Sequence, residues 1–198
     1  MSTRTASITR NTNETQIELS LNLDGTGAFD IQLPREAGAP FWQHMLEQWS
    51  KHGRFDLTIK ATGDVHIDGH HLIEDLGIAL GQALHKAVGD KRGIARYGFF
   101  IAPMDEVLTL CAVDFCGRAF LHLDWTMRQE RIGEFDTHLA NEFLVALANN
   151  ARINLHIREM HGGNAHHVIE ASMKAMARAM RAALTVDGNE LPTTKGML

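Results

Sequence analysis

The sequence is poor in cysteine and lacks both a long apolar run and an excess of basic residues. Its two cysteines, Cys111 and Cys116, fall in one predicted strand and the turn after it, which is a poor geometry for a disulfide. No stretch of about 18 apolar residues occurs, and the first residues lack the apolar run of a secretion signal. We therefore expect a cytoplasmic protein with no disulfide and no membrane partner.

The chain also has no concentration of positive charge. Its 19 lysines and arginines and 24 aspartates and glutamates give a formal net charge of -5, and the basic residues are scattered along the sequence. This gives no electrostatic reason to expect a nucleic-acid partner. With 198 residues, of which 44% are hydrophobic and 22% charged, the composition is typical of a globular protein with a sizeable core, built as one unit or as two small halves.

Periodicity predicts two strands early in the chain. Apolar residues alternate at 16–21 and at 29–33, and the residues at 24–27 are typical of a turn, so we expect the two strands to pair as a hairpin. The other predicted elements of the first half are a helix from Pro40 to Gly53, a strand at 55–61 and a helix from about His70.

The second half is predicted to repeat this plan. Its predicted elements are strands at 97–102, 107–113 and 120–125, a helix at 136–150, a strand at 152–157, and a last helix whose apolar face carries Ile169, Met173, Met176 and Met180. We interpret this order as an internal duplication, with a first half-domain at 1–90 and a second half-domain at 91–198 that includes a C-terminal tail.

Histidine is the residue that departs from ordinary usage, with 12 in the chain. One motif of two adjacent histidines and a glutamate opens a long predicted helix in each half. It consists of His70, His71 and Glu74 in the first half and of His166, His167 and Glu170 in the second. The outer histidine and the glutamate lie one helical turn apart and can chelate one metal, whereas the middle histidine points about 100° away and can serve another.

Each half has one more histidine in its preceding predicted helix, His44 in the first and His138 in the second. A lone histidine is more often a surface or core residue than a ligand, but two matching copies of the motif favour metal binding. Six histidines and two glutamates without thiolates suit manganese, iron, cobalt or zinc used for catalysis. Three histidines and one glutamate per metal would leave octahedral positions open, which predicts a substrate that ligates metal.

Over nearly its whole length the chain resembles the imidazoleglycerol-phosphate dehydratases. The resemblance is carried by the segments at 12–15, 40–46, 68–75, 102–106, 114–118, 164–171 and 192–196. Cys116, Met173 and Thr193 stand where the family usually has serine, phenylalanine and serine. The resemblance implies an α+β fold of duplicated βββαβα halves, each a four-stranded sheet with helices packed on one face, like domain 2 of ribosomal protein S5.

The resemblance also implies two manganese ions per active site. One ion would be held by His44, His71, His166 and Glu170, and the other by His70, Glu74, His138 and His167. The family forms a homo-oligomer of about 24 subunits with octahedral symmetry and with sites at subunit boundaries. Its reaction, a step of L-histidine biosynthesis, removes water from D-erythro-imidazole glycerol 3-phosphate to give imidazole acetol phosphate. The implied partner is therefore a small phosphorylated imidazole.

The family's functional residues are carried over by position. The implied catalytic residues are Glu14, as the acid or base, with His70, Glu74, His166 and Glu170. The implied substrate contacts add His44, His71 and His167 on the imidazole side and Arg96, Arg118, Lys174, Thr194 and Lys195 around the phosphate. Any one of these cations could alone be a solvated charge.

Carbon–hydrogen bonds beside a neutral imidazole are not acidic, which is why the chemistry favours two metals. Ions on both ring nitrogens would stabilise an imidazolate, whose electrons can expel the neighbouring hydroxyl. The alternative function is a two-metal hydrolase of a small phosphorylated substrate, which requires a bridging water instead. A non-catalytic metal-binding or shell-forming protein would keep the metal ligands but would not need Glu14 or the cations.

Overall fold

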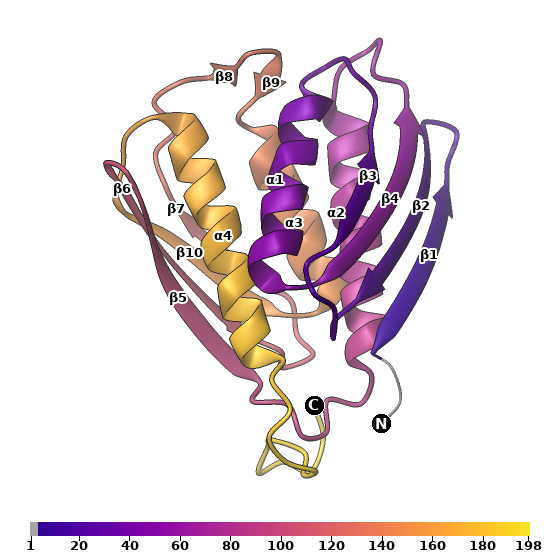
Figure 1. Ribbon diagram of the computed structural model, residues 1–198, viewed down its shortest axis with the longest axis vertical. Coiled ribbons are helices and arrows are strands. Elements are labelled where there is room, and N and C mark those ends of the chain that lie inside the picture. The colour runs from indigo at the N-terminus through magenta and orange to yellow at the C-terminus, as the bar shows by residue number, and fades with distance from the viewer. Residues whose placement is uncertain (1–3) are drawn as a thin grey trace.

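Two four-stranded sheets form the outer layers of the molecule, and four helices lie between them (Figure 1). The structure is a computed structural model that describes residues 4–198, so residues 1–3 of the predicted first half-domain lie outside the described residues. The first half contains β1 (Thr5–Asn11), β2 (Thr15–Asn22), β3 (Phe29–Gln32), α1 (Ala39–Gly53), β4 (Asp56–Gly63) and α2 (His70–Val88).

The second half repeats this order with one small insertion. It contains β5 (Tyr97–Met104), β6 (Val107–Asp114), β7 (Phe120–Asp124), β8 (Arg131–Ile132), β9 (Phe135–Asp136), α3 (Leu139–Ala151), β10 (Asn154–His161) and α4 (Ala165–Ala183). The strand orders are β1-β2-β4-β3 and β5-β6-β10-β7, and the short pair β8–β9 is the insertion. The predicted α+β fold of duplicated βββαβα halves is confirmed, and the proposed boundary at residue 90 falls between α2 and β5.

The predicted hairpin in the first half is wrong. β2 pairs with β1 and β4, and β3 pairs in parallel with β4 on its far side, so β2 and β3 are not neighbours. The cause is a long-range contact: Oδ1 of Asp56, at the start of β4, accepts hydrogen bonds from the backbone N–H groups of Thr26, Gly27 and Ala28. The turn is therefore held across the end of β4.

β1, like the short strands β8 and β9, was not identified from alternation. Its residues Ala6, Ile8 and Arg10 share the less exposed face, and the third of these positions is charged. Arg10 forms an ion pair with the buried carboxylate of Asp75 on α2, with an Nη2–Oδ1 distance of 2.8 Å. A charged residue at an inward position breaks the apolar pattern that predicts a strand.

The helices of the two halves pack against one another across the centre of the molecule. α2 lies against α3, and α1 lies against α4, so each half's second helix contacts the other half's first helix. Gly77 and Gly81 allow the closest approach, because a Cβ on either would overlap the backbone oxygens of Phe143 and Leu147 on α3. One core results, shared by both halves.

The core contains the residues that the helical periodicity predicts. Ile169, Met173, Met176 and Met180 of α4 are each no more than 2% exposed, as expected for an apolar stripe. Cys111 and Cys116 are buried and free, in agreement with the prediction of no disulfide. Among residues 4–198, no helix is long and apolar enough to cross a membrane.

All four helices begin at the same end of the molecule, the upper end in Figure 1. Each runs from there towards the opposite end, where the segment after α4 and the C-terminus lie. Because the paired histidines stand in the first turns of α2 and α4, this arrangement brings the histidine motifs of both halves to one end.

Candidate metal centres and anion pocket

A polar side chain two residues earlier holds the backbone of the first histidine at the start of three helices. The acceptor is Asp68 for His70 (2.8 Å), Asp136 for His138 (3.0 Å) and Asn164 for His166 (2.9 Å), in each case through the backbone N–H of the histidine. These side chains satisfy donors that a helix leaves free in its first turn. They also fix the direction in which each imidazole leaves the backbone.

Three of the predicted ligands of the first metal converge in one chain. Nε2 of His166 lies 3.0 Å from Oε2 of Glu170, and Nε2 of His44 lies 3.6 Å from the same oxygen. The donor atoms of these three residues all lie within 4.8 Å of one another. α1 supplies His44 because this helix packs along α4. Phe41 of α1 also packs edge-on against the ring of His166, with 5.1 Å between the ring centroids. Two imidazoles and a carboxylate at this spacing fit a divalent metal of the manganese-to-zinc series.

Glu170 is the buried member of this cluster, with 6% of its surface exposed. Burial disfavours its charged form, but the hydrogen bond from Lys174 and the contacts with His166 and His44 outweigh that effect and lower the pKa of the carboxyl below its usual value. Nζ of Lys174 lies 2.7 Å from Oε1 of Glu170. The carboxylate is thus ionised at neutral pH, as metal binding requires.

The predicted ligands of the second metal are placed more loosely. Nε2 of His70 lies 3.8 Å from Oε2 of Glu74 one turn along α2. His138 lines the same pocket as His70, a cavity of about 750 Å³ whose lining also includes residues of β8 and β9. Nδ1 of His138 lies 3.9 Å from Oε1 of Glu142, one turn along α3. The structure therefore brings His70 and His138 to one pocket without closing the predicted ligand set.

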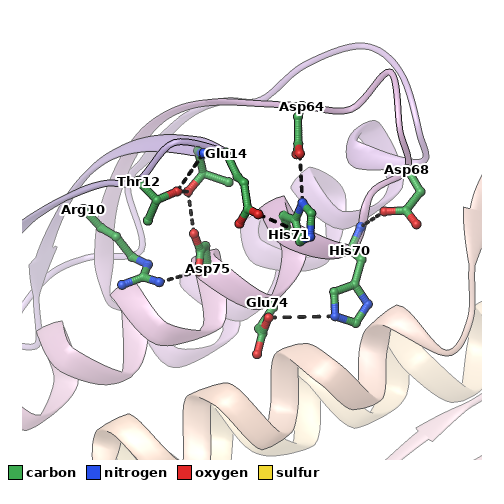
Figure 2. A network of polar contacts seen from close by, with 10 residues as sticks. Arg10, Thr12, Glu14, Asp64, Asp68, His70, His71, Glu74 and Asp75 are labelled. Carbon is green, nitrogen blue, oxygen red and sulfur yellow. Dashed lines mark hydrogen bonds and ion pairs between the residues drawn. The ribbon is translucent and has the colours of Figure 1, made fainter.

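The middle histidine of the first motif lies apart from its predicted cluster. Nδ1 of His71 is 2.9 Å from Oδ2 of Asp64, and Nε2 is 3.8 Å from Oε1 of Glu14. Figure 2 shows both carboxylates directed at this one ring. The hydrogen bond with Asp64 raises the pKa of His71 above its ordinary value.

The middle histidine of the second motif is held in a similar way. Nδ1 of His167 is 2.9 Å from Oε2 of Glu106, and Nε2 is 3.9 Å from Oδ2 of Asp105. Oε1 of Glu106 accepts the backbone N–H of Asn164, and that hydrogen bond together with His167 lowers the pKa of Glu106 to about 2. Within one chain, neither middle histidine joins the ligands that the resemblance assigns to it.

Glu14 is positioned by the turn between β1 and β2. The hydroxyl oxygen of Thr12 accepts from the backbone N–H groups of Glu14 (3.0 Å) and Thr15 (2.9 Å). Thr15 in turn donates from its hydroxyl to the buried Asp75 of α2, so the turn is tied to the helix that carries His71 (Figure 2). The side chain of Glu14 is half-exposed and points toward the ring of His71 (Figure 2).

The predicted phosphate contacts converge in part. Arg96, Arg118, Thr194 and Lys195 line one pocket of about 400 Å³ at the end of the molecule opposite the histidine motifs. Lys174 does not line it and instead pairs with Glu170. This pocket and the histidine clusters are therefore separated within a single chain.

Arg96 also has a structural role. Its Nε and Nη2 donate to the carboxylate of Asp114 at 2.7 and 3.1 Å, and Nη1 donates to the carbonyl of Pro192 at 2.9 Å. These bonds fix the C-terminal tail against the end of β6. Arg118 and Lys195 are exposed, so their charged groups face solvent at this pocket.

Sequence reasoning missed the carboxylates that contact the histidines and the arginine. Asp105 and Glu106 lie in the segment at 102–106, and Asp114 lies in that at 114–118, so the resemblance drew attention to them without giving them a role. Asp64 carries no such signal. Its contact with His71 follows from the strand-to-helix connection, which has no periodic signature in the sequence.

Comparison with known proteins shows which family the chain resembles. The family model for imidazoleglycerol-phosphate dehydratase matches residues 37–180. The imidazoleglycerol-phosphate dehydratase of Methylorubrum populi is 52% identical over 98% of this chain and all of its own length, and that of Prochlorococcus marinus is 50% identical over all of this chain and 98% of its own. Among solved structures, the dehydratase of Staphylococcus aureus superposes with a TM-score of 0.80 at 37% identity, covering 92% of this chain and 99% of that one.

Proposed function

The chain belongs to the imidazoleglycerol-phosphate dehydratase family, and we propose that it dehydrates imidazoleglycerol phosphate in histidine biosynthesis with two manganese ions per active site. The family makes the chain a hydro-lyase whose substrate is a small phosphorylated imidazole. Its biosynthetic role supports a cytoplasmic location. The observation that carries the metal proposal is the convergence of His44, His166 and Glu170 within 4.8 Å.

We assign the two sets of four ligands named from the resemblance to two ions shared between neighbouring subunits. The support is that His71 and His167 lie apart from their assigned sets within one chain. The anion pocket lies at the end opposite the histidines, so one substrate can reach both only if a neighbouring subunit supplies one of them. The family's octahedral assembly of about 24 subunits would meet both needs.

Different groups of the site then have different roles toward the substrate. When bound, the two ions would supply Lewis acids to the two nitrogens of an imidazole ring. Glu14 moves a proton at carbon: its carboxylate makes no hydrogen bond with another of residues 4–198 and lies 3.8 Å from Nε2 of His71. Arg118 and Lys195 bind the phosphate, with Arg96 holding the tail in place.

Product analysis tests the proposal directly. Imidazoleglycerol phosphate with manganese is expected to give a ketone that alkali reveals, with no release of inorganic phosphate. The alternative two-metal hydrolase predicts the opposite result, phosphate without ketone. A chain that binds metal but yields neither product would be the non-catalytic shell protein.

The two ligand sets predict about two manganese ions per chain. Protein freed of chelator, supplied with manganese and passed through gel filtration is expected to show this ratio by elemental analysis. His166→Ala should lower it, because His166 is one of the three converging donors, whereas His52→Ala, a change on α1 outside both sets, should not. A ratio near one or zero in the unaltered protein would contradict the assignment of two sites.

The C-terminal tail is predicted to bind phosphate. Deleting residues 193–198 removes Thr194 and Lys195 from the pocket and no proposed metal ligand. Because a charge-assisted contact is worth roughly 1.5 to 3 kcal/mol, the Michaelis constant is expected to rise about ten- to hundredfold with metal content unchanged. Lys195→Ala should reproduce most of this rise, whereas Lys51→Ala, at an exposed position on α1, should have no effect. Normal substrate saturation after the deletion would remove the tail from the site.

A further inference from the structure

In each half, a carboxylate from outside the helix contacts Nδ1 of the middle histidine. Asp64 follows β4 and lies 2.9 Å from Nδ1 of His71, and Glu106 stands in the turn between β5 and β6 and lies 2.9 Å from Nδ1 of His167. The two halves reach the same contact from different segments. In both halves the contacted atom is Nδ1, and Nε2 is the ring nitrogen that would face the proposed metal.

An ionised carboxylate can only accept a hydrogen bond, so Nδ1 must carry the proton in both contacts. In a neutral imidazole the other nitrogen, Nε2, then keeps a free lone pair. The carboxylates nearest to Nε2 are Glu14 at 3.8 Å from His71 and Asp105 at 3.9 Å from His167, beyond hydrogen-bond distance. The geometry leaves Nε2 of both histidines available to a ligand.

Asp64 and Glu106, the two carboxylates that contact Nδ1, are themselves held by backbone hydrogen bonds. The second oxygen of Glu106 accepts the backbone N–H of Asn164 at 2.7 Å, which fixes it to the start of α4. The backbone N–H of Asp64 donates to the carbonyl of Glu14 at 3.0 Å, which fixes it beside the turn between β1 and β2. A rigid acceptor orients the ring that it contacts.

The contacts also show how the two halves have diverged. Glu14 and Glu106 stand at matching places, each directly before the second strand of its half. Glu106 contacts Nδ1 of its histidine, whereas Glu14 lies on the Nε2 side of His71. In the first half, Asp64 makes the Nδ1 contact instead. The carboxylate of Glu14 is therefore not needed for that contact and can serve in proton transfer.

We propose that Asp64 and Glu106 are positioning residues that hold His71 and His167 in the Nδ1-protonated form and direct Nε2 to the metal. The proposal rests on the proposed function in one respect, that both histidines bind metal. Carboxylate partners of this kind raise the affinity of a ligand histidine by fixing its tautomer and its orientation.

The test is a manganese titration of the metal-stripped full-length protein, with free manganese read by electron paramagnetic resonance. Asp64→Ala and Glu106→Ala are each expected to weaken one class of sites by about ten- to hundredfold. Asp64→Asn should retain most of the affinity, because its amide oxygen still accepts from Nδ1. Glu106→Gln should retain less, because Glu106 accepts through both of its oxygens and an amide has only one acceptor. Asp90→Asn, at an exposed pair with Arg92, is the control for loss of a negative charge.

A double-mutant cycle separates positioning from a structural role. If Asp64 acts through His71, adding Asp64→Ala to His71→Ala should cause no further loss of manganese affinity, and likewise for Glu106 with His167. Unchanged affinity in the single variants, or an equal loss with and without the histidine, overturns the proposal. Equal melting temperatures of the metal-free variants and the parent exclude unfolding as the cause. Because no substrate is present, failure of the dehydratase assay would leave this result standing.

Discussion

Exchanging Glu14 for glutamine is expected to lower kcat by about 10²- to 10⁴-fold, the range for loss of a general acid or base. The amide keeps the size of the side chain and its place in the Thr12 turn, but it cannot take up a proton. Manganese content should be unchanged, because Glu14 belongs to neither ligand set. The effect should fall on kcat far more than on the Michaelis constant, since no phosphate contact is lost.

Steady-state kinetics of Glu14→Gln and of Glu18→Gln provide the measurement and its control. Glu18 is an exposed carboxylate on β2, the strand that directly follows Glu14, and its loss should leave turnover near that of the unaltered enzyme. A Glu14→Gln enzyme with ordinary kcat would assign the proton transfer to another group.

Two inactive variants are expected to restore activity when they assemble together. His71→Ala and Glu170→Ala each remove one proposed ligand of the same metal, and each alone should lower activity by about 100-fold or more. If His71 comes from one subunit and Glu170 from its neighbour, some interfaces in a mixed oligomer receive both intact residues. Random pairing of two chain types makes that fraction about one quarter.

Co-expression of two differently tagged chains, followed by tandem purification and assay, measures this rescue. The matched control combines His166→Ala with Glu170→Ala. Both changes fall in the first turns of α4, so no pairing of subunits rebuilds the His44, His166 and Glu170 cluster, and activity should stay low. Equal activity of the two mixtures would place each metal within a single chain. Light scattering on both mixtures checks that assembly is complete.

Local geometry explains which parts of the site could be predicted. The pairing of His166 with Glu170 follows from their spacing of one helical turn, and the structure shows these two side chains 3.0 Å apart. The place of His44 beside them depends on how α1 packs against α4, which periodicity does not encode. That contact was predicted only through the resemblance to a family.

Long-range polar contacts explain where prediction failed. Asp56 lies about thirty residues from the turn that it holds, and the hairpin expected there is replaced by a parallel pairing of β3 with β4. Glu106 lies 61 residues from His167 in the sequence. Contacts of this kind leave no pattern in composition or periodicity, because each depends on the path of the whole chain between two single residues.

The exchange of helix partners between the halves bears on how such a chain arose. α2 packs on α3 and α1 packs on α4, so each half covers the apolar helix faces of the other as two identical subunits do about a twofold axis. An ancestor of half the length would have left those faces in water as a monomer. Two copies could cover those faces as a symmetric dimer, and in this chain the short segment between α2 and β5 joins the two halves directly.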